Sequence, residues 1–276
     1  MFDLPQDINE AAKGSLSGSG TKVQLPFAAP ELWWKNGEPA IAGMKEITDA
    51  RRFGGWGISK SELDNLTGPI PPLPEKWQLF ELTNAKGKTY EAYLTRSAWV
   101  APIARRHAWF NYEGKNQSRV NYLCYLGVMG ADKKLLPWGA VVISSKSFDG
   151  VNLDNLFKDF ASKTSNLRGN TMQNYFYTPL GTFRPEPLFE VRKGKGGSES
   201  SVTPCQLFEN KDGYTIDSLK SVFVGTLIAT EMVSLKKQAT EWLDEWNKKK
   251  DDRVTAVQPE VNVPHDFQEE ENPFDL

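Results

Sequence analysis

Two stretches of the sequence mix basic side chains with aromatic rings. Between Arg96 and Tyr125, five bases and six aromatic residues accompany a single acid, Glu113, and a similar mixture extends from Arg168 to Lys195. This mixture suits single-stranded nucleic acid, because cations contact the phosphates while flat rings stack on unpaired bases. The candidate contacts in these stretches are Arg96, Arg105, Arg106, Trp109, Tyr112, Arg119, Tyr122, Arg168, Tyr175, Tyr177, Arg184, Arg192, Lys193 and Lys195.

A third basic and aromatic patch adds Arg51, Arg52 and Trp56 to the candidates. The alternative for any one ring is burial in a hydrophobic core, and for Trp56 this means packing with Trp33 and Trp34. For the clusters as a whole, the excess of bases over acids favours binding.

Residues for catalysis are few. The chain has two histidines, His107 and His265, and two cysteines, Cys124 and Cys205, that lie far apart in the sequence. None of the common metal-binding or phosphate-binding motifs occurs. We therefore expect no enzymatic activity, no metal and no cofactor, although scattered carboxylates that come together in space would give a different answer.

The formal net charge of -2 combines two parts of opposite sign. Residues 251–276 contain eight acids and one base, so the first 250 residues carry a charge of +5. This asymmetry predicts a body that binds a polyanion and a tail that binds partners. The segment after Asp251 shows no hydrophobic periodicity, which predicts disorder.

The last eleven residues, DFQEEENPFDL, join an acidic run to an apolar tip. This segment resembles the C-terminal tail of bacterial and bacteriophage single-stranded DNA-binding proteins, but Asp275 and Leu276 follow the Phe here. The resemblance implies binding of single-stranded DNA in replication or recombination, with recruitment of replication and recombination proteins by the tail. Because its charge has the same sign as that of DNA, we also expect the acidic tail to occupy the groove when DNA is absent. The residues that the resemblance assigns to partner binding are Asp266, Glu269, Glu270, Glu271, Pro273 and Phe274.

Changes in composition and stretches rich in Gly, Ser and Pro divide the chain into four segments. With 39% hydrophobic residues the chain can form a sizeable core. We expect a flexible arm over 1–22, an aromatic, Gly- and Pro-rich extension over 23–76 that packs on the core, a nucleic-acid-binding domain over 77–250 and a disordered acidic tail over 251–276.

Within the domain the pattern is strands, a short helix and further strands. A hairpin is expected over 77–95, strands over 120–129, 138–144 and 172–178, a helix over 149–163 and a long C-terminal helix over 215–249. This order predicts a mixed β fold with helices, in which a five-stranded Greek-key barrel of the oligonucleotide-binding (OB) type forms the core. Other mixed folds would give the same order.

No stretch of 18 uninterrupted apolar residues occurs, so we expect no membrane span. The acidic start of the chain is not that of a secretory signal, and we expect a cytoplasmic protein, in the host cytoplasm if it is viral. A homo-oligomer is compatible with the sequence.

Two alternatives to a single-stranded DNA-binding protein stay open: an interaction or scaffold module, and a nucleic-acid-processing enzyme. The preference for DNA or RNA also stays open.

Overall fold

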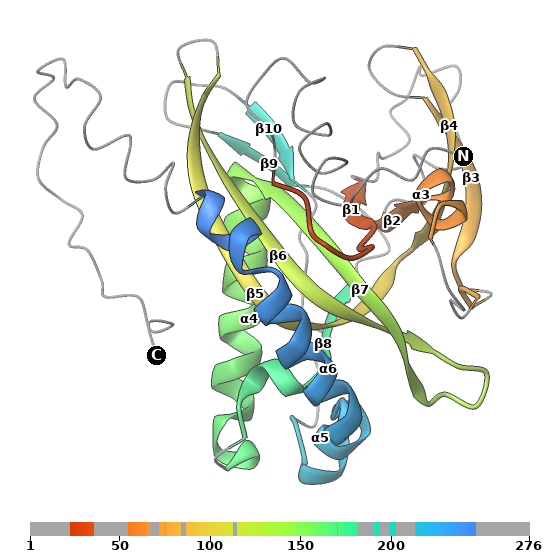
Figure 1. The fold of residues 1–276 in the computed structure, drawn as a ribbon, viewed down its shortest axis with the longest axis vertical. Helices are drawn as coiled ribbons and strands as arrows, with labels where there is room; N and C mark the ends of the chain where they lie inside the picture. Colours follow the sequence, from red (N-terminus) through yellow and green to blue (C-terminus); the bar gives the residue numbers. More distant parts are fainter. Residues whose placement is uncertain are drawn as a thin grey trace, which may run out of the picture.

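The computed structural model describes residues 23–35, 55–66, 72–74, 76–83, 87–112, 115–169, 171–181, 190–193, 199–202 and 213–246 (Figure 1). The strands are β1 (Glu31–Lys35), β2 (Gly55–Ser59), β3 (Gln78–Thr83), β4 (Thr89–Thr95), β5 (Ser97–Tyr112), β6 (Lys115–Met129), β7 (Leu135–Lys146), β8 (Thr178–Gly181), β9 (Glu190–Lys193) and β10 (Glu199–Val202). The helices are α3 (Lys60–Asp64), α4 (Ser147–Arg168), the 3-10 helix η1 (Gln173–Tyr175), α5 (Ile216–Val222) and α6 (Gly225–Gln238). Residues 240–246 form a further helical segment after α6.

Eight strands form one open mixed sheet in the order β3-β4-β2-β1-β7-β6-β5-β8, and β9 pairs with β10 separately. The β1–β7 pairing is parallel and the other pairings are antiparallel. The predicted five-stranded OB barrel is therefore wrong. The prediction failed because the glycines and prolines of the 23–76 segment placed it outside the core as an extension, whereas this segment supplies β1 and β2, which lie between β4 and β7.

Two of these glycines have specific structural roles in β2. Gly55 adopts a φ of +109°, which disfavours any residue with a side chain. Gly57 lies under the indole of Trp33, and an added Cβ there would lie 2.6 Å from both that ring and the Leu94 side chain. The glycines thus allow close packing within the sheet.

The sheet curls because β4 and β5 are separated by one residue, Arg96, although four other strands lie between them in the sheet order. β4 pairs with β2 and β3, whereas β5 pairs with β6 and β8. The predicted hairpin over 77–95 is confirmed as β3 and β4.

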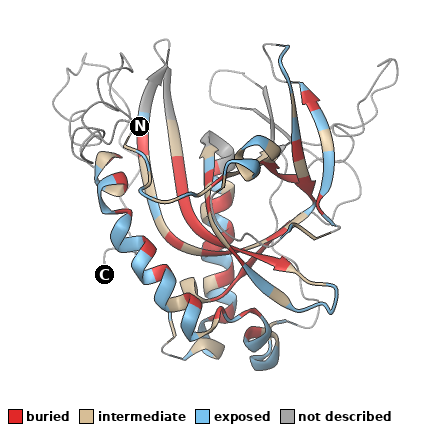
Figure 2. Cartoon of the chain, turned by 45° about the vertical axis from the view of Figure 1, so that its right-hand side comes forward, coloured by how far each residue is buried: buried red, intermediate tan, exposed pale blue. Residues whose placement is uncertain are grey.

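Helices cover both faces of the long strands β5, β6 and β7. Tyr122 and Tyr125, three residues apart on β6, point to opposite faces. The first donates a hydrogen bond to Asp154 of α4 and the second to Glu231 of α6. Figure 1 accordingly shows α4 behind the strands and α6 in front of them. Figure 2 shows buried positions along the central strands, and alternation of buried and exposed positions along α6.

The helix predicted over 149–163 is confirmed as α4, whose apolar residues Leu153, Leu156, Phe157 and Phe160 are buried in the core. The single long helix predicted over 215–249 is wrong. Phe223 is extended and bridges to Phe176, and Gly225 has a φ of +80°. These two residues separate α5 from α6, because neither backbone conformation continues an α-helix. The strand predicted over 172–178 is replaced by η1 and this bridge.

Candidate nucleic-acid interface

The outer part of the β5–β6 hairpin extends beyond the rest of the sheet. Pairing of β6 with β7 begins at Arg119, so residues 115–118 of β6 pair only with residues 109–112 of β5 among the described strands. We call these two segments the arm. At the rise of a β-strand, four residues extend about 13 Å. In Figure 1 the arm rises past the end of β7.

Arg105, His107 and Trp109 share one face of β5 at the base of the arm, because alternate residues of a strand point the same way. The indole of Trp109 is 46% exposed. The His107 ring stands edge-on to it, with 5.9 Å between the ring centroids, and its Nε2 lies 3.0 Å from the Ser118 hydroxyl. A cation, an imidazole and an exposed indole therefore follow each other at steps of about 6.8 Å.

Arg105 forms a two-pronged ion pair with α4. Its Nε and Nη2 donate hydrogen bonds of 3.1 and 2.7 Å to the carboxylate of Asp154. The Tyr122 hydroxyl donates to the same carboxylate at 2.5 Å. Burial, reinforced by the charge of Asp154, raises the pKa of Tyr122 well above its usual value, so the hydroxyl keeps its proton.

Arg106, the next residue, points to the opposite face and is used internally. Its Nη1 donates to the carbonyl oxygen of Trp242 at 2.7 Å and to the Glu245 carboxylate at 3.2 Å. Its Cζ lies 3.6 Å from the ring centroid of Trp242 and 4.2 Å from that of Trp246. Burial lowers the pKa of Arg106 to about 10 against the opposing effect of Glu245, so the guanidinium is charged at neutral pH. Arg106 anchors residues 240–246 to β5.

Several other predicted contacts lie in the core or serve local structure. The rings of Trp56, Tyr122 and Tyr177 are buried, and half-buried Tyr175 packs against the core. Arg168 ends α4 by donating hydrogen bonds to Thr164 and to backbone carbonyls. These residues are not presented to a ligand as Trp109 is.

The remaining predicted contacts are separated. Arg96 is exposed where β4 becomes β5, and Arg119 is half-buried on β6. For Tyr112, Arg192 and Lys193 the structure describes the strands but not the side chains. The predicted residues outside the described ranges are Arg51, Arg52, Arg184, Lys195, Asp266, Glu269, Glu270, Glu271, Pro273 and Phe274. The flexible N-terminal segment predicted over 1–22 and the acidic tail predicted over 251–276 also lie outside the described ranges.

Sequence reasoning missed the partners of the two arginines. Asp154 lies next to Leu153, at the margin of the buried face of α4, and a carboxylate in such a position needs a partner. That placement was the available signal for Asp154. Glu245 lies between two tryptophans that are buried, and this was the corresponding signal near the end of the helical region.

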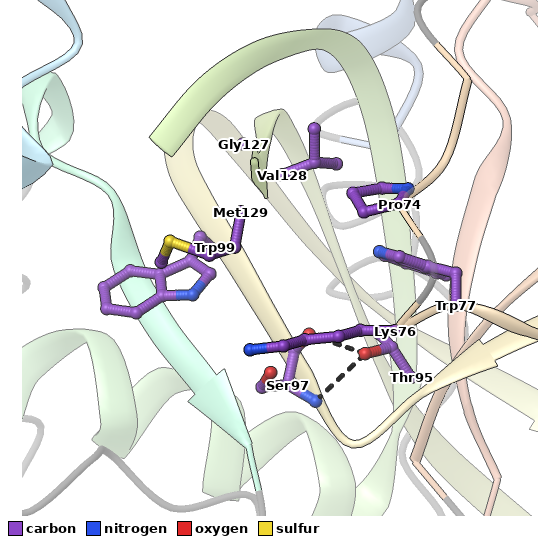
Figure 3. A pocket seen from close by; sticks show the side chains of 9 residues that line it. All are labelled: Pro74, Lys76, Trp77, Thr95, Ser97, Trp99, Gly127, Val128 and Met129. Carbon is purple, nitrogen blue, oxygen red and sulfur yellow. Dashed lines mark hydrogen bonds between the residues drawn. The ribbon is translucent and has the colours of Figure 1, made fainter. Parts of the chain in front are cut away.

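A small pocket with a cavity volume of about 20 Å³ lies where β4 becomes β5 (Figure 3). Trp77, Trp99 and Lys76 are among its lining residues, and the Thr95 hydroxyl at its rim is already bonded to the backbone of Ser97. The pocket shares no lining residue with the row of Arg105, His107 and Trp109 on β5. Its volume is below the usual range of ligand sites, so it does not compete with that row as the candidate site.

Among the described residues, no helix is long and apolar enough to cross a membrane. The same part of the chain contains no group of three or more His, Cys, Asp or Glu residues placed to share a metal ion. No protein-family model, no curated protein and no solved structure matches the chain.

Proposed function

We propose that this chain is a non-enzymatic protein that binds single-stranded nucleic acid, as a single-stranded DNA-binding protein does in replication or recombination. The observation that carries the proposal is the half-exposed indole of Trp109 on a protruding arm, in line with Arg105 and His107. An exposed ring on an extended strand can stack on an unpaired base whatever its sequence. Nearby cations then contact the phosphates.

The structure lowers the number of cations that the sequence offers to the ligand. Arg106 is neutralised by Glu245, and Arg168 is directed to the end of its own helix. If two or three of the described cations, Arg105 among them, contact phosphates, we expect the logarithm of the affinity to fall with the logarithm of salt concentration with a slope of about -1.5 to -2. Binding should therefore depend on stacking as much as on charge.

The acidic segment 266–276, which carries Phe274 near its end, completes the proposed function. An acidic, extended segment with one exposed aromatic residue can insert that ring into a pocket of a partner protein. We propose that it recruits replication or recombination proteins to the strand that the body holds. The support is the sequence of residues 266–276.

The experiment compares binding of fluorescent oligo-dT and of duplex of equal length. The wild-type protein should bind the single strand more tightly, because a duplex hides the faces of its bases. Trp109→Ala should weaken oligo-dT binding about 5- to 150-fold, which corresponds to about 1–3 kcal/mol for one stacked base. Leu136→Ala is the matched control, since Leu136 is 48% exposed on β7 outside the arm, and it should bind normally.

Equal affinity for single strand and duplex would contradict stacking and leave only a basic surface. If the wild-type protein does not bind oligo-dT, the proposal is wrong and an interaction module becomes the better hypothesis. If the Trp109 and Leu136 variants bind alike, the arm is not the site.

A further inference from the structure

The ion pair between Arg105 and Asp154 leaves the guanidinium able to bind a second group. A guanidinium has five N–H donors, and two of them, one on Nε and one on Nη2, point at the carboxylate. The two on Nη1 and the second on Nη2 form another edge, which suits a phosphate as well as a carboxylate. The Arg105 side chain is 33% exposed, so a ligand has access to part of it.

Asp154 is itself held in place. Its Oδ1 accepts from the buried Tyr122 hydroxyl at 2.5 Å as well as from Arg105. The Tyr122 ring packs on Phe157, with 4.7 Å between the centroids, and the Arg105 Cζ lies 6.0 Å from the centroid of the Tyr122 ring. The carboxylate is thus bound from two sides, and the long arginine side chain is restricted before any ligand arrives.

We propose that Arg105 is a pre-oriented phosphate-binding fork for the backbone of a single strand, and that Asp154 is the residue that positions it. This inference rests on the proposed function of the arm. Trp109 lies four positions after Arg105 on β5, a distance of about 13.5 Å along the strand. At the 3.4 Å rise of a stacked strand, about four nucleotides extend over that distance, and fewer if the strand is stretched.

The positioning role of Asp154 predicts that removal of this acid weakens binding of a polyanion. On electrostatic grounds alone, removal of a carboxylate from a surface that binds a polyanion tightens binding. If Asp154 positions the fork, its replacement weakens binding, because Arg105 is then free to adopt many rotamers and loses more entropy when it binds. The two effects have opposite signs, so one substitution separates them.

The test measures oligo-dT binding by fluorescence anisotropy for wild type, Asp154→Asn and Asp159→Asn. Asp159 is the matched control because it also lies on α4 and pairs with a base, Lys163, at 2.8 Å. We expect Asp154→Asn to weaken binding about 3- to 10-fold and to make the salt dependence shallower. Asp159→Asn should leave the affinity unchanged or raise it slightly.

Arg105→Lys supports the test should Asp154→Asn unfold the protein, which thermal denaturation will show. Lysine keeps the charge but lacks the fork, so it too should weaken oligo-dT binding several-fold. Tighter or unchanged binding by Asp154→Asn in a folded protein would overturn the inference, as would wild-type affinity of Arg105→Lys. If wild type itself does not bind oligo-dT, the function of the arm is wrong, and that result is distinct from either of these.

Discussion

Replacement of Arg106 by methionine tests whether residues 240–246 are held to β5 by this side chain. Methionine is similar in length and unbranched, so it fills much of the space between the rings of Trp242 and Trp246 without the charge. The side chains of Arg106 and Glu245 are each only 9% exposed. The substitution therefore removes the Arg106 guanidinium from beside a buried carboxylate.

The loss of the Arg106 charge beside buried Glu245 determines the expected loss of stability. Removal of one partner of a buried ion pair costs about 3–5 kcal/mol, because the other charge stays desolvated. The lost cation–π contacts belong to the same difference and are not added to it. For a domain of roughly 200 residues this lowers the melting temperature by about 6–20 °C. Arg106→Met combined with Glu245→Met should recover most of the loss, since an apolar pair of similar size is often tolerated.

The assay is urea unfolding followed by tryptophan fluorescence, with limited proteolysis to detect release of residues 240–246. Arg106→Met should lower the free energy of unfolding and expose this segment to protease, and the double variant should behave more like wild type. A loss below about 1 kcal/mol, the usual value for an exposed ion pair, would refute the reasoning. It would show that the two tryptophans hold the segment without Arg106.

Gly57→Ala should destabilise the protein by about 1–3 kcal/mol in thermal denaturation, because the added Cβ would lie 2.6 Å from the side chains of Leu94 and Trp33 in a packed core; a neutral result would mean that β2 moves to accept it. Phe274→Ala keeps every charge of the tail, so capture of replication or recombination proteins on immobilised protein should fall while oligo-dT affinity stays the same. A parallel loss of DNA binding would contradict the assignment of Phe274 to partner recruitment.

Local elements could be predicted from the sequence where one periodic pattern dominates. The alternation of Tyr90, Ala92 and Leu94 predicted β4, and the spacing of Leu153 and Phe157 predicted α4. The sheet order could not be predicted, because it depends on pairing between strands that are distant in sequence. A glycine such as Gly57 gives the same signal whether it forms a turn or makes room for a ring.

For the candidate site, residue type was a weaker guide than strand geometry. Arg105 and Arg106 are identical in the sequence, yet one is partly exposed and the other is enclosed by two rings, because adjacent residues of a strand face opposite ways. Their partners lie on α4 and in residues 240–246, about 50 and about 140 positions away. Trp109 is the one ring among the candidates with a described side chain that the structure leaves strongly exposed.

The parallel pairing of β1 with β7 constrains the order in which the nascent chain can fold. Leu32 pairs with Ile143, about 110 residues later, and a ribosome adds about 5–20 residues per second. For about 6–22 seconds, therefore, β1 has been synthesised while its parallel partner has not. During this interval Leu32, Trp33 and Trp34 are not covered by β7. Exposed apolar surface of this kind binds other chains or chaperones. Because β1 lies between β2 and β7, the complete sheet cannot form until β7 has been synthesised.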